Sequence, residues 1–83
     1  HFAPRPHPPL RATLAWTEEQ FLAHFRGTPV ERLGLARWRR NALTVLGNVG
    51  TTADLPAAEA LLGDPDPMVA EHAAWSVARL RTR

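Results

Sequence analysis

The chain has 83 residues, of which 45% are hydrophobic and 22% charged, and it contains no cysteine. A chain of this length forms one domain, and its apolar runs are far shorter than the roughly 18 residues that would cross a bilayer. The absence of cysteine excludes disulfides, thiolate metal sites and cysteine nucleophiles within these residues. We therefore expect a small cytoplasmic domain without a membrane partner.

The charge is positive but localised. All ten basic residues are arginines, and the formal net charge is only +2. Residues 1–50 are basic, whereas residues 51–83 are mildly acidic. This distribution is compatible with a localised surface that faces a polyanion and excludes a strong global field.

Residues 1–16 are predicted to form a proline-rich linker or arm. Four of the eight prolines lie in the first nine positions. Proline fixes its own φ and disfavours helix at the residue before it, so the segment is expected to be extended. His1 and His7 have no third ligand nearby, so a linker is favoured over a metal site. The sequence resembles a piece cut from a longer chain.

Helix signals begin at Thr17. Thr17 and Gln20 are spaced as a capping box, and they predict a helix that ends at Gly27. Thr28 followed by Pro29 predicts a second, shorter helix, which Gly34 interrupts.

Three further helices are predicted downstream. The first runs from Leu35 to Gly47, and the second is capped by Thr52 or Asp54 and runs to Leu62. The last is capped by Asp66 and covers about residues 67–81. No segment alternates with a period of two, so the domain, residues 17–83, is predicted to be all-α.

The two long helices carry an internal repeat. A shift of 31 positions superimposes apolar or small residues, which predicts one apolar stripe in both helices. The matched pairs are Trp38 with Val69, Ala42 with Ala73, Leu46 with Val77, Gly47 with Ala78, and Val49 with Leu80. A repeated helix, Asp-rich turn and helix is typical of HEAT-like repeats, which stack into an α–α superhelix; an ordinary four-helix bundle is the alternative.

Three blocks of sequence resemble a known family. They are Phe25-Arg26-Gly27-Thr28-Pro29-Val30, then Arg39-Arg40-Asn41-Ala42 with Leu46-Gly47-Asn48, then Asp64-Pro65-Asp66-Pro67 leading into Glu71-His72-Ala73-Ala74-Trp75. In this order they resemble the C-terminal region of tRNA epoxyqueuosine reductase, over about residues 1–81. The chain departs from the family pattern at Glu31 and Ala70, where basic residues are common, which weakens the expectation of nucleic-acid contacts at those two positions.

The resemblance implies a role in an oxidoreductase of queuosine biosynthesis, which acts at the wobble position of tRNA. The family joins a cobalamin domain, a ferredoxin-like domain with two [4Fe–4S] clusters and a C-terminal HEAT-like domain. Its cluster ligands are cysteines, and its cobalamin-binding residues lie upstream. This chain alone is therefore expected to bind no cofactor and to be catalytically inert. The implied partners are the tRNA anticodon region and the upstream domains of the same enzyme.

An independent enzyme is disfavoured. His24, His72 and Glu71 could act as acids or bases, but Glu71 and His72 are neighbours about 100° apart on a helix and do not converge on one substrate. His24 lies among apolar residues and is interpreted as a boundary residue. No nucleophile elbow, phosphate loop or metal-ligand spacing is present.

Two helix strips are the candidate sites. On the helix from Leu35, an arginine-rich strip lies opposite the apolar stripe and could grip phosphates. The predicted RNA-binding residues are Arg37 and Arg40 on this strip, Arg39 at its flank, and Arg26 and Arg32 near the preceding helix caps. The alternative is that these arginines only form a solvated face.

The second strip comprises Met68, His72 and Trp75, followed by Arg79, and is predicted to be an interface. It could be buried against a neighbouring helix of this chain, the missing domains or a second copy. The function predicted from both strips is a tRNA-docking module. The alternative is a generic HEAT-repeat fragment that binds proteins and has no RNA role.

Overall fold

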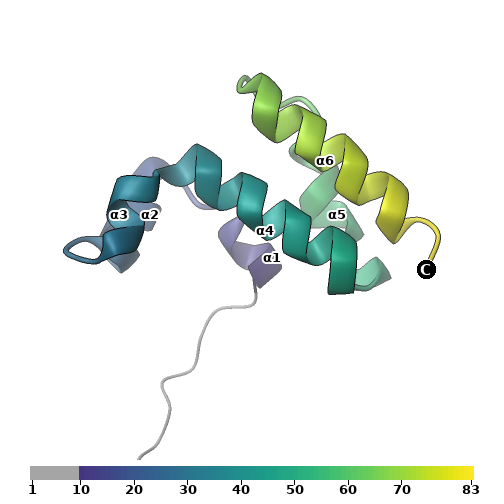
Figure 1. Cartoon of the computed structure of the whole chain (residues 1–83), viewed down its shortest axis with the longest axis horizontal. Coiled ribbons are helices and arrows are strands. Elements are labelled where there is room, and N and C mark those ends of the chain that lie inside the picture. The colour runs from purple at the N-terminus through teal and green to yellow at the C-terminus, as the bar shows by residue number, and fades with distance from the viewer. Residues whose placement is uncertain (1–9) are drawn as a thin grey trace, which may run out of the picture.

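The computed structural model describes residues 10–83, which contain helices and no strand (Figure 1). The elements are α1 (Leu10–Thr13), α2 (Glu18–Phe25), α3 (Pro29–Leu33), α4 (Leu35–Val49), the 3-10 helix η1 (Thr52–Asp54), α5 (Leu55–Glu59) and α6 (Pro67–Leu80). The all-α prediction is confirmed.

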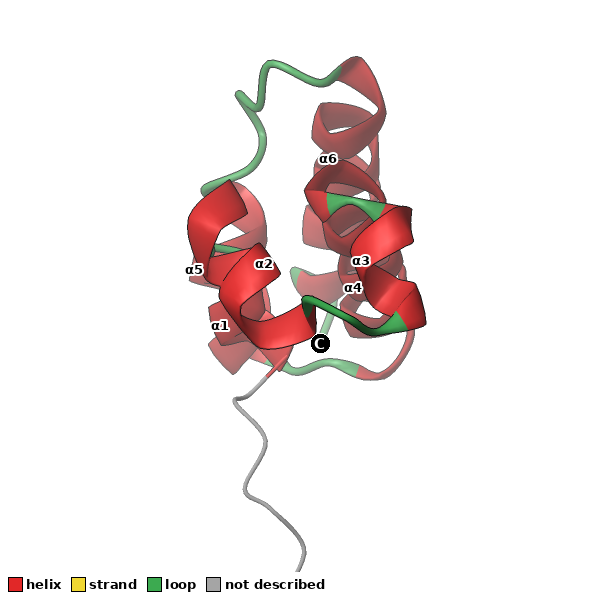
Figure 2. Ribbon diagram, turned by 90° about the vertical axis from the view of Figure 1, so that its left-hand side faces the viewer, coloured by secondary structure: helices red, strands yellow, loops and turns green. Residues whose placement is uncertain are grey.

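The helices form two layers. Figure 2 shows α1, α2 and α5 in one layer and α3, α4 and α6 in the other. The core between them consists of Leu14, Ala42, Leu43, Leu46, Ala58, Leu61, Val69, Ala73, Val77 and Leu80. Two layers are what stacked helical repeats would give, and the HEAT-like assignment stays a prediction.

The long helices α4 and α6 lie side by side and run in the same direction (Figure 1). Arg40 contacts Met68, 28 residues further along, and Arg79 donates to the carbonyl of Gly47, 32 residues earlier. Since the separation stays nearly constant along both helices, they are parallel. Their pairing accounts for the sequence repeat of about this length.

The predicted ends of the first helices are confirmed. Thr17 Oγ1 accepts from the Gln20 amide at 3.2 Å, and Gln20 Oε1 accepts from the Thr17 amide at 2.9 Å. Gly27 and Gly34 have φ of 82° and 84°, a left-handed conformation that glycine adopts without the steric cost of a Cβ. These glycines end α2 and separate α3 from α4.

The predicted helix between residues 52 and 62 is wrong in extent. The chain forms the short 3-10 helix η1 and then α5, which ends at Glu59. The capping residue is Thr51, whose amide donates to Asp54 Oδ2 at 2.9 Å. Pro56 has no N–H to donate to the Thr52 carbonyl, so a regular α-helix cannot begin at Thr52. In contrast, Asp66 caps α6 as predicted, accepting from the Met68 amide at 2.9 Å.

The predicted apolar stripe is correct in its centre and wrong at its end. Ala42, Ala73, Leu46 and Val77 are all buried. Val49, however, is 76% exposed, whereas its predicted counterpart Leu80 is fully buried. Val49 is the last residue of α4 and its side chain extends beyond the core.

The pairing of Gly47 with Ala78 also fails, and one core residue is missing from the stripe. Gly47 is buried and Ala78 is exposed. Leu43 is fully buried although the stripe omits it, because α4 packs against α1 as well as α6.

The described part of the predicted arm is packed and not extended. Residues 10–13 form α1, and Thr13 and Leu14 are 3% and 1% exposed. The Trp38 indole N–H donates to Thr13 Oγ1 at 2.8 Å. The apolar residues that follow the proline-rich stretch allow this short helix to pack into the core. Residues 1–9, with His1 and His7, lie outside the described residues.

Within residues 10–83, no helix has the length and hydropathy needed to cross a membrane.

Candidate nucleic-acid interface

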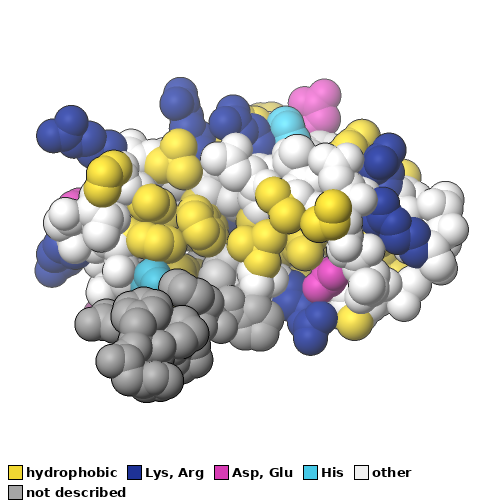
Figure 3. Space-filling model, turned by 60° about the horizontal axis from the view of Figure 1, so that its bottom comes forward, with side chains coloured by type: hydrophobic (Ala, Val, Ile, Leu, Met, Phe, Trp, Pro, Cys, Tyr) yellow, Lys and Arg dark blue, Asp and Glu magenta, His cyan; other side chains and the backbone are white. Residues whose placement is uncertain are grey.

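The two candidate strips lie on neighbouring helices and form one surface. We call this the α4–α6 surface and define it by Arg37, Arg40 and Thr44 on α4 and by Met68, Glu71, His72, Trp75 and Arg79 on α6. Arg40 Nη1 lies 3.8 Å from Met68 Sδ, and a hollow between the helices is lined by Thr44, Glu71, His72 and Trp75. Along the upper edge of the molecule in Figure 3, arginine side chains lie beside a histidine and an acidic group.

Arg37 and Arg40 occupy the start of this surface. Arg37 is exposed and Arg40 is half-buried. Arg40 donates from Nε and Nη2 to Asn41 Oδ1, at 3.2 and 3.1 Å, which holds its guanidinium beside the Asn41 side chain. Because the amide of Asn41 is neutral, the positive charge of Arg40 remains available to an anion.

Arg39 lies in a different environment from the other predicted RNA-binding residues. Its side chain is only 20% exposed and forms an ion pair with Asp64 at 3.3 Å. Its guanidinium also donates to the carbonyls of Leu14 at 3.2 Å and Trp16 at 2.8 Å. The guanidinium of Arg39 therefore joins three segments of the domain and is not part of the exposed arginine surface.

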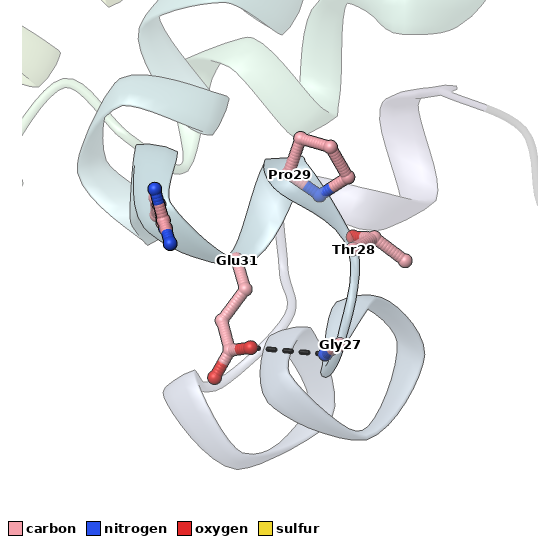
Figure 4. Close-up of a pocket in the computed structure, with 5 residues that line it drawn as sticks. Gly27, Thr28, Pro29 and Glu31 are labelled. Carbon is pink, nitrogen blue, oxygen red and sulfur yellow. Dashed lines mark hydrogen bonds between the residues drawn. The ribbon is translucent and has the colours of Figure 1, made fainter.

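Arg26 and Arg32 lie near the turn between α2 and α3, at the N-terminal end of α4 (Figure 1). Both are exposed. Arg32 lines a hollow with Gly27, Thr28, Pro29 and Glu31 (Figure 4). Glu31 Oε1 accepts from the Gly27 amide at 2.9 Å, so this amide is already satisfied. A carboxylate in this position repels phosphate, which disfavours the hollow itself as an anion site.

Trp75 is held against α4 but stays partly exposed. A Cβ added at Gly47 would overlap the six-membered ring of Trp75. The Arg79 guanidinium lies 5.1 Å from the ring centroid, and Arg79 Nε donates to the Gly47 carbonyl at 2.9 Å. Trp75 nevertheless remains 39% exposed. A neighbouring helix of the same chain thus covers part of the indole, and the rest faces solvent.

His72 is oriented by its own helix. His72 Nδ1 donates to the Met68 carbonyl at 2.8 Å when the imidazole carries its proton on this nitrogen. In that neutral tautomer Nε2 is an acceptor. Met68 itself packs against the core.

His24, the other histidine considered for catalysis, contacts aromatic rings. Its ring centroid lies 5.1 Å from that of Trp16 and 4.7 Å from that of Phe25. The side chain is exposed. This placement agrees with the interpretation of His24 as a boundary residue.

One contributor was not on either predicted strip: Glu71, which lines the hollow. Arg79 was placed on the second strip by its spacing, four residues after Trp75 on one helix face, and its guanidinium lies against the Trp75 ring. The role of Gly47 had no such signal, since its counterpart in the repeat is an ordinary alanine.

The residues present do not fit the iron–sulfur clusters that the family resemblance implies. Iron–sulfur clusters are held by cysteine thiolates, and the chain has no cysteine. Among residues 10–83 no three His, Asp or Glu side chains are placed to hold a metal ion.

Curated relatives resemble this chain over most of its length. A protein named epoxyqueuosine reductase from Shewanella oneidensis is 35% identical, covering 98% of this chain and 22% of the relative. The protein of the same name from Pseudomonas aeruginosa is 42% identical, covering 77% of this chain and 18% of the relative. The Escherichia coli protein of that name is 38% identical, covering 87% and 19%.

No family model and no solved structure matches the chain. The chain spans about a fifth of the length of the curated relatives, and the matched segment is their C-terminal part. The predicted resemblance is therefore confirmed: over most of its length this chain is similar to the C-terminal region of the epoxyqueuosine reductases.

Proposed function

We propose that this chain is the tRNA-docking module of an epoxyqueuosine reductase. In this proposal its arginines bind the anticodon region of tRNA. The module thereby helps to present the wobble nucleoside to cobalamin and [4Fe–4S] domains that belong to the rest of the enzyme. The similarity to the C-terminal part of proteins named epoxyqueuosine reductase supports the enzyme context.

The observation that supports an RNA-binding role is that, within the described residues, some arginines form ion pairs with carboxylates, whereas Arg37 and Arg40 do not. Among residues 10–83, the ion pairs join Arg11 to Asp54, Arg39 to Asp64 and Arg81 to Glu59. Arg37 and Arg40 take part in none of them. Two adjacent, solvent-accessible guanidinium groups without a carboxylate partner favour an anionic ligand, and RNA phosphates match their planar donor geometry.

The location of these arginines supports contact with a folded RNA. Arg37 and Arg40 lie about one turn apart on α4, and Arg79 extends the positive charge onto α6. Arg26 and Arg32 add exposed positive charge near the N-terminal end of α4. A surface of this kind binds phosphates from several nucleotides, and its affinity depends on salt because bound counterions are released.

The proposal is tested by removing the positive charge of the α4 strip. An anticodon stem-loop with a fluorescent label is titrated with the chain over a series of salt concentrations. The Arg37→Ala/Arg40→Ala variant should bind more weakly, and the slope of log K against log salt should flatten by roughly 0.7 to 0.9 for each phosphate that the variant no longer neutralises. Its thermal unfolding should stay close to that of the unmodified chain, since surface changes usually alter stability by less than about 0.5 kcal/mol.

A matched control distinguishes the effect of losing a local contact from the effect of losing net charge. Arg37→Ala and Arg81→Ala each remove one positive charge, but Arg81 pairs with Glu59 away from the proposed surface. Arg37→Ala should weaken binding more than Arg81→Ala. Unchanged affinity and salt slope in the double variant would contradict RNA docking by this strip.

A further inference from the structure

The hollow on the α4–α6 surface combines groups that phosphate contact does not require. It has a volume of about 400 Å³ and is lined by Thr44, Glu71, His72 and Trp75. We propose that this hollow binds one unpaired guanine base of the RNA, with the Glu71 carboxylate accepting from the base edge. This inference rests on the proposed function and adds a base-specific site to it.

Glu71 is the first reason. Among residues 10–83 no Arg or His nitrogen lies within ion-pair distance of its carboxylate, and the side chain is exposed. A carboxylate among arginines weakens the attraction of a phosphate, so it does not improve a site for the RNA backbone. It does accept hydrogen bonds from N–H groups on base edges.

The other polar groups of the hollow are also arranged as acceptors. Thr44 Oγ1 donates its proton to the Arg40 carbonyl at 3.0 Å, which leaves its lone pairs as acceptors. In the neutral tautomer that donates from Nδ1 to the Met68 carbonyl, Nε2 of His72 is also an acceptor. A hollow rich in acceptors selects a ligand edge rich in donors. Guanine presents adjacent N1–H and N2–H₂ donors on its Watson–Crick edge, where adenine and cytosine each have an acceptor next to the amino group.

Trp75 supplies an apolar contact for the base. Its ring is held by Gly47 and Arg79, and the residue remains 39% exposed. Aromatic side chains that contact unpaired bases are a common means of RNA recognition, and a ring fixed before binding loses little entropy on binding. The surrounding arginines repel the cationic peptides that an acceptor-rich hollow could otherwise attract.

The test compares short uridine oligomers that carry one central guanosine, adenosine or inosine. Inosine keeps N1–H but lacks the N2 amino group. The chain should bind the guanosine oligomer roughly fivefold or more tighter than the adenosine oligomer, with inosine between them. In ¹⁵N–¹H spectra, the indole N–H resonance of Trp75 should shift with guanosine.

Glu71→Gln should abolish most of this preference while leaving the fold intact, because the side chain is exposed. Glu19→Gln makes the same charge change at an exposed site on α2 and should keep the preference. Equal binding of all three oligomers, or an unchanged preference in Glu71→Gln, would overturn the guanine site and leave salt-dependent docking in place. Failure of both the oligomers and the anticodon stem-loop to bind would overturn both proposals.

Discussion

Single arginines of this chain have different roles because their guanidinium groups meet different acceptors. Arg39 binds two carbonyls and a carboxylate inside the domain. Arg79 and Arg83 donate to the carbonyls of Gly47 and Asn48 at the end of α4, where cations also compensate the helix dipole. Arg37, in contrast, projects from α4 as an exposed side chain. Sequence identifies all of them as arginines, but only their three-dimensional neighbours separate structural from exposed ones.

Arg39→Ala should destabilise the domain far more than Arg37→Ala. It removes an ion pair and two charged hydrogen bonds at a mostly buried position, so we expect a loss of about 2–3 kcal/mol in the free energy of unfolding. Arg39→Lys should recover little of this loss, because a single ammonium cannot reach all three acceptors. Urea denaturation of the three variants measures the difference; equal stability of the Arg39 and Arg37 alanine variants would refute the structural role of Arg39.

Individual helices were predictable where local residues determine their ends. The Thr17 capping box, Gly27, Gly34 and the Asp66 cap act through bonds within a few residues of the chain, and all are confirmed. The break at η1 was missed, although Pro56 signals it, because a proline in the first turn is also compatible with one continuous helix.

The candidate site was less predictable than the helices. Helical periodicity placed Arg37 and Arg40 on one strip and His72 and Trp75 on another. It did not show that the two strips would meet, because this depends on the parallel packing of α4 and α6. The structural role of Arg39 depends on hydrogen bonds to the carbonyls of Leu14 and Trp16, and both residues belong to a segment predicted to be an arm.

The close packing of α4 and α6 predicts a strong effect of side-chain size at Ala73. Ala73 is fully buried in the core, whereas the next residue, Ala74, is exposed. Ala73→Leu should overpack this contact and cost about 1–3 kcal/mol. Ala74→Leu adds the same atoms at the solvent face and should change stability by less than about 0.5 kcal/mol. Thermal unfolding distinguishes the two, and an equal melting temperature for both variants would refute the packing.

At the scale of the whole molecule, the small core depends on its N-terminal segment. A domain of this size buries only about 60% of the surface that its unfolded chain exposes, so each buried side chain matters. Leu14 is 1% exposed within the core, and Asp54, which is 8% exposed, pairs with Arg11 at 3.1 Å. Residues 10–16 thus contact α4, η1 and α5, and the predicted division at residue 16 crosses these contacts.

A chain that begins at Thr17 should therefore be much less stable than one that begins at Leu10. It loses the Leu14 side chain, for which removal of a buried leucine typically costs about 2–5 kcal/mol. It also loses the two carbonyl acceptors of Arg39 and the partners of Trp38 and Asp54. Urea denaturation followed by circular dichroism should show a cooperative transition for the chain from Leu10 and a weak or absent one for the chain from Thr17. Equal midpoints would instead support residues 17–83 as the complete folding unit.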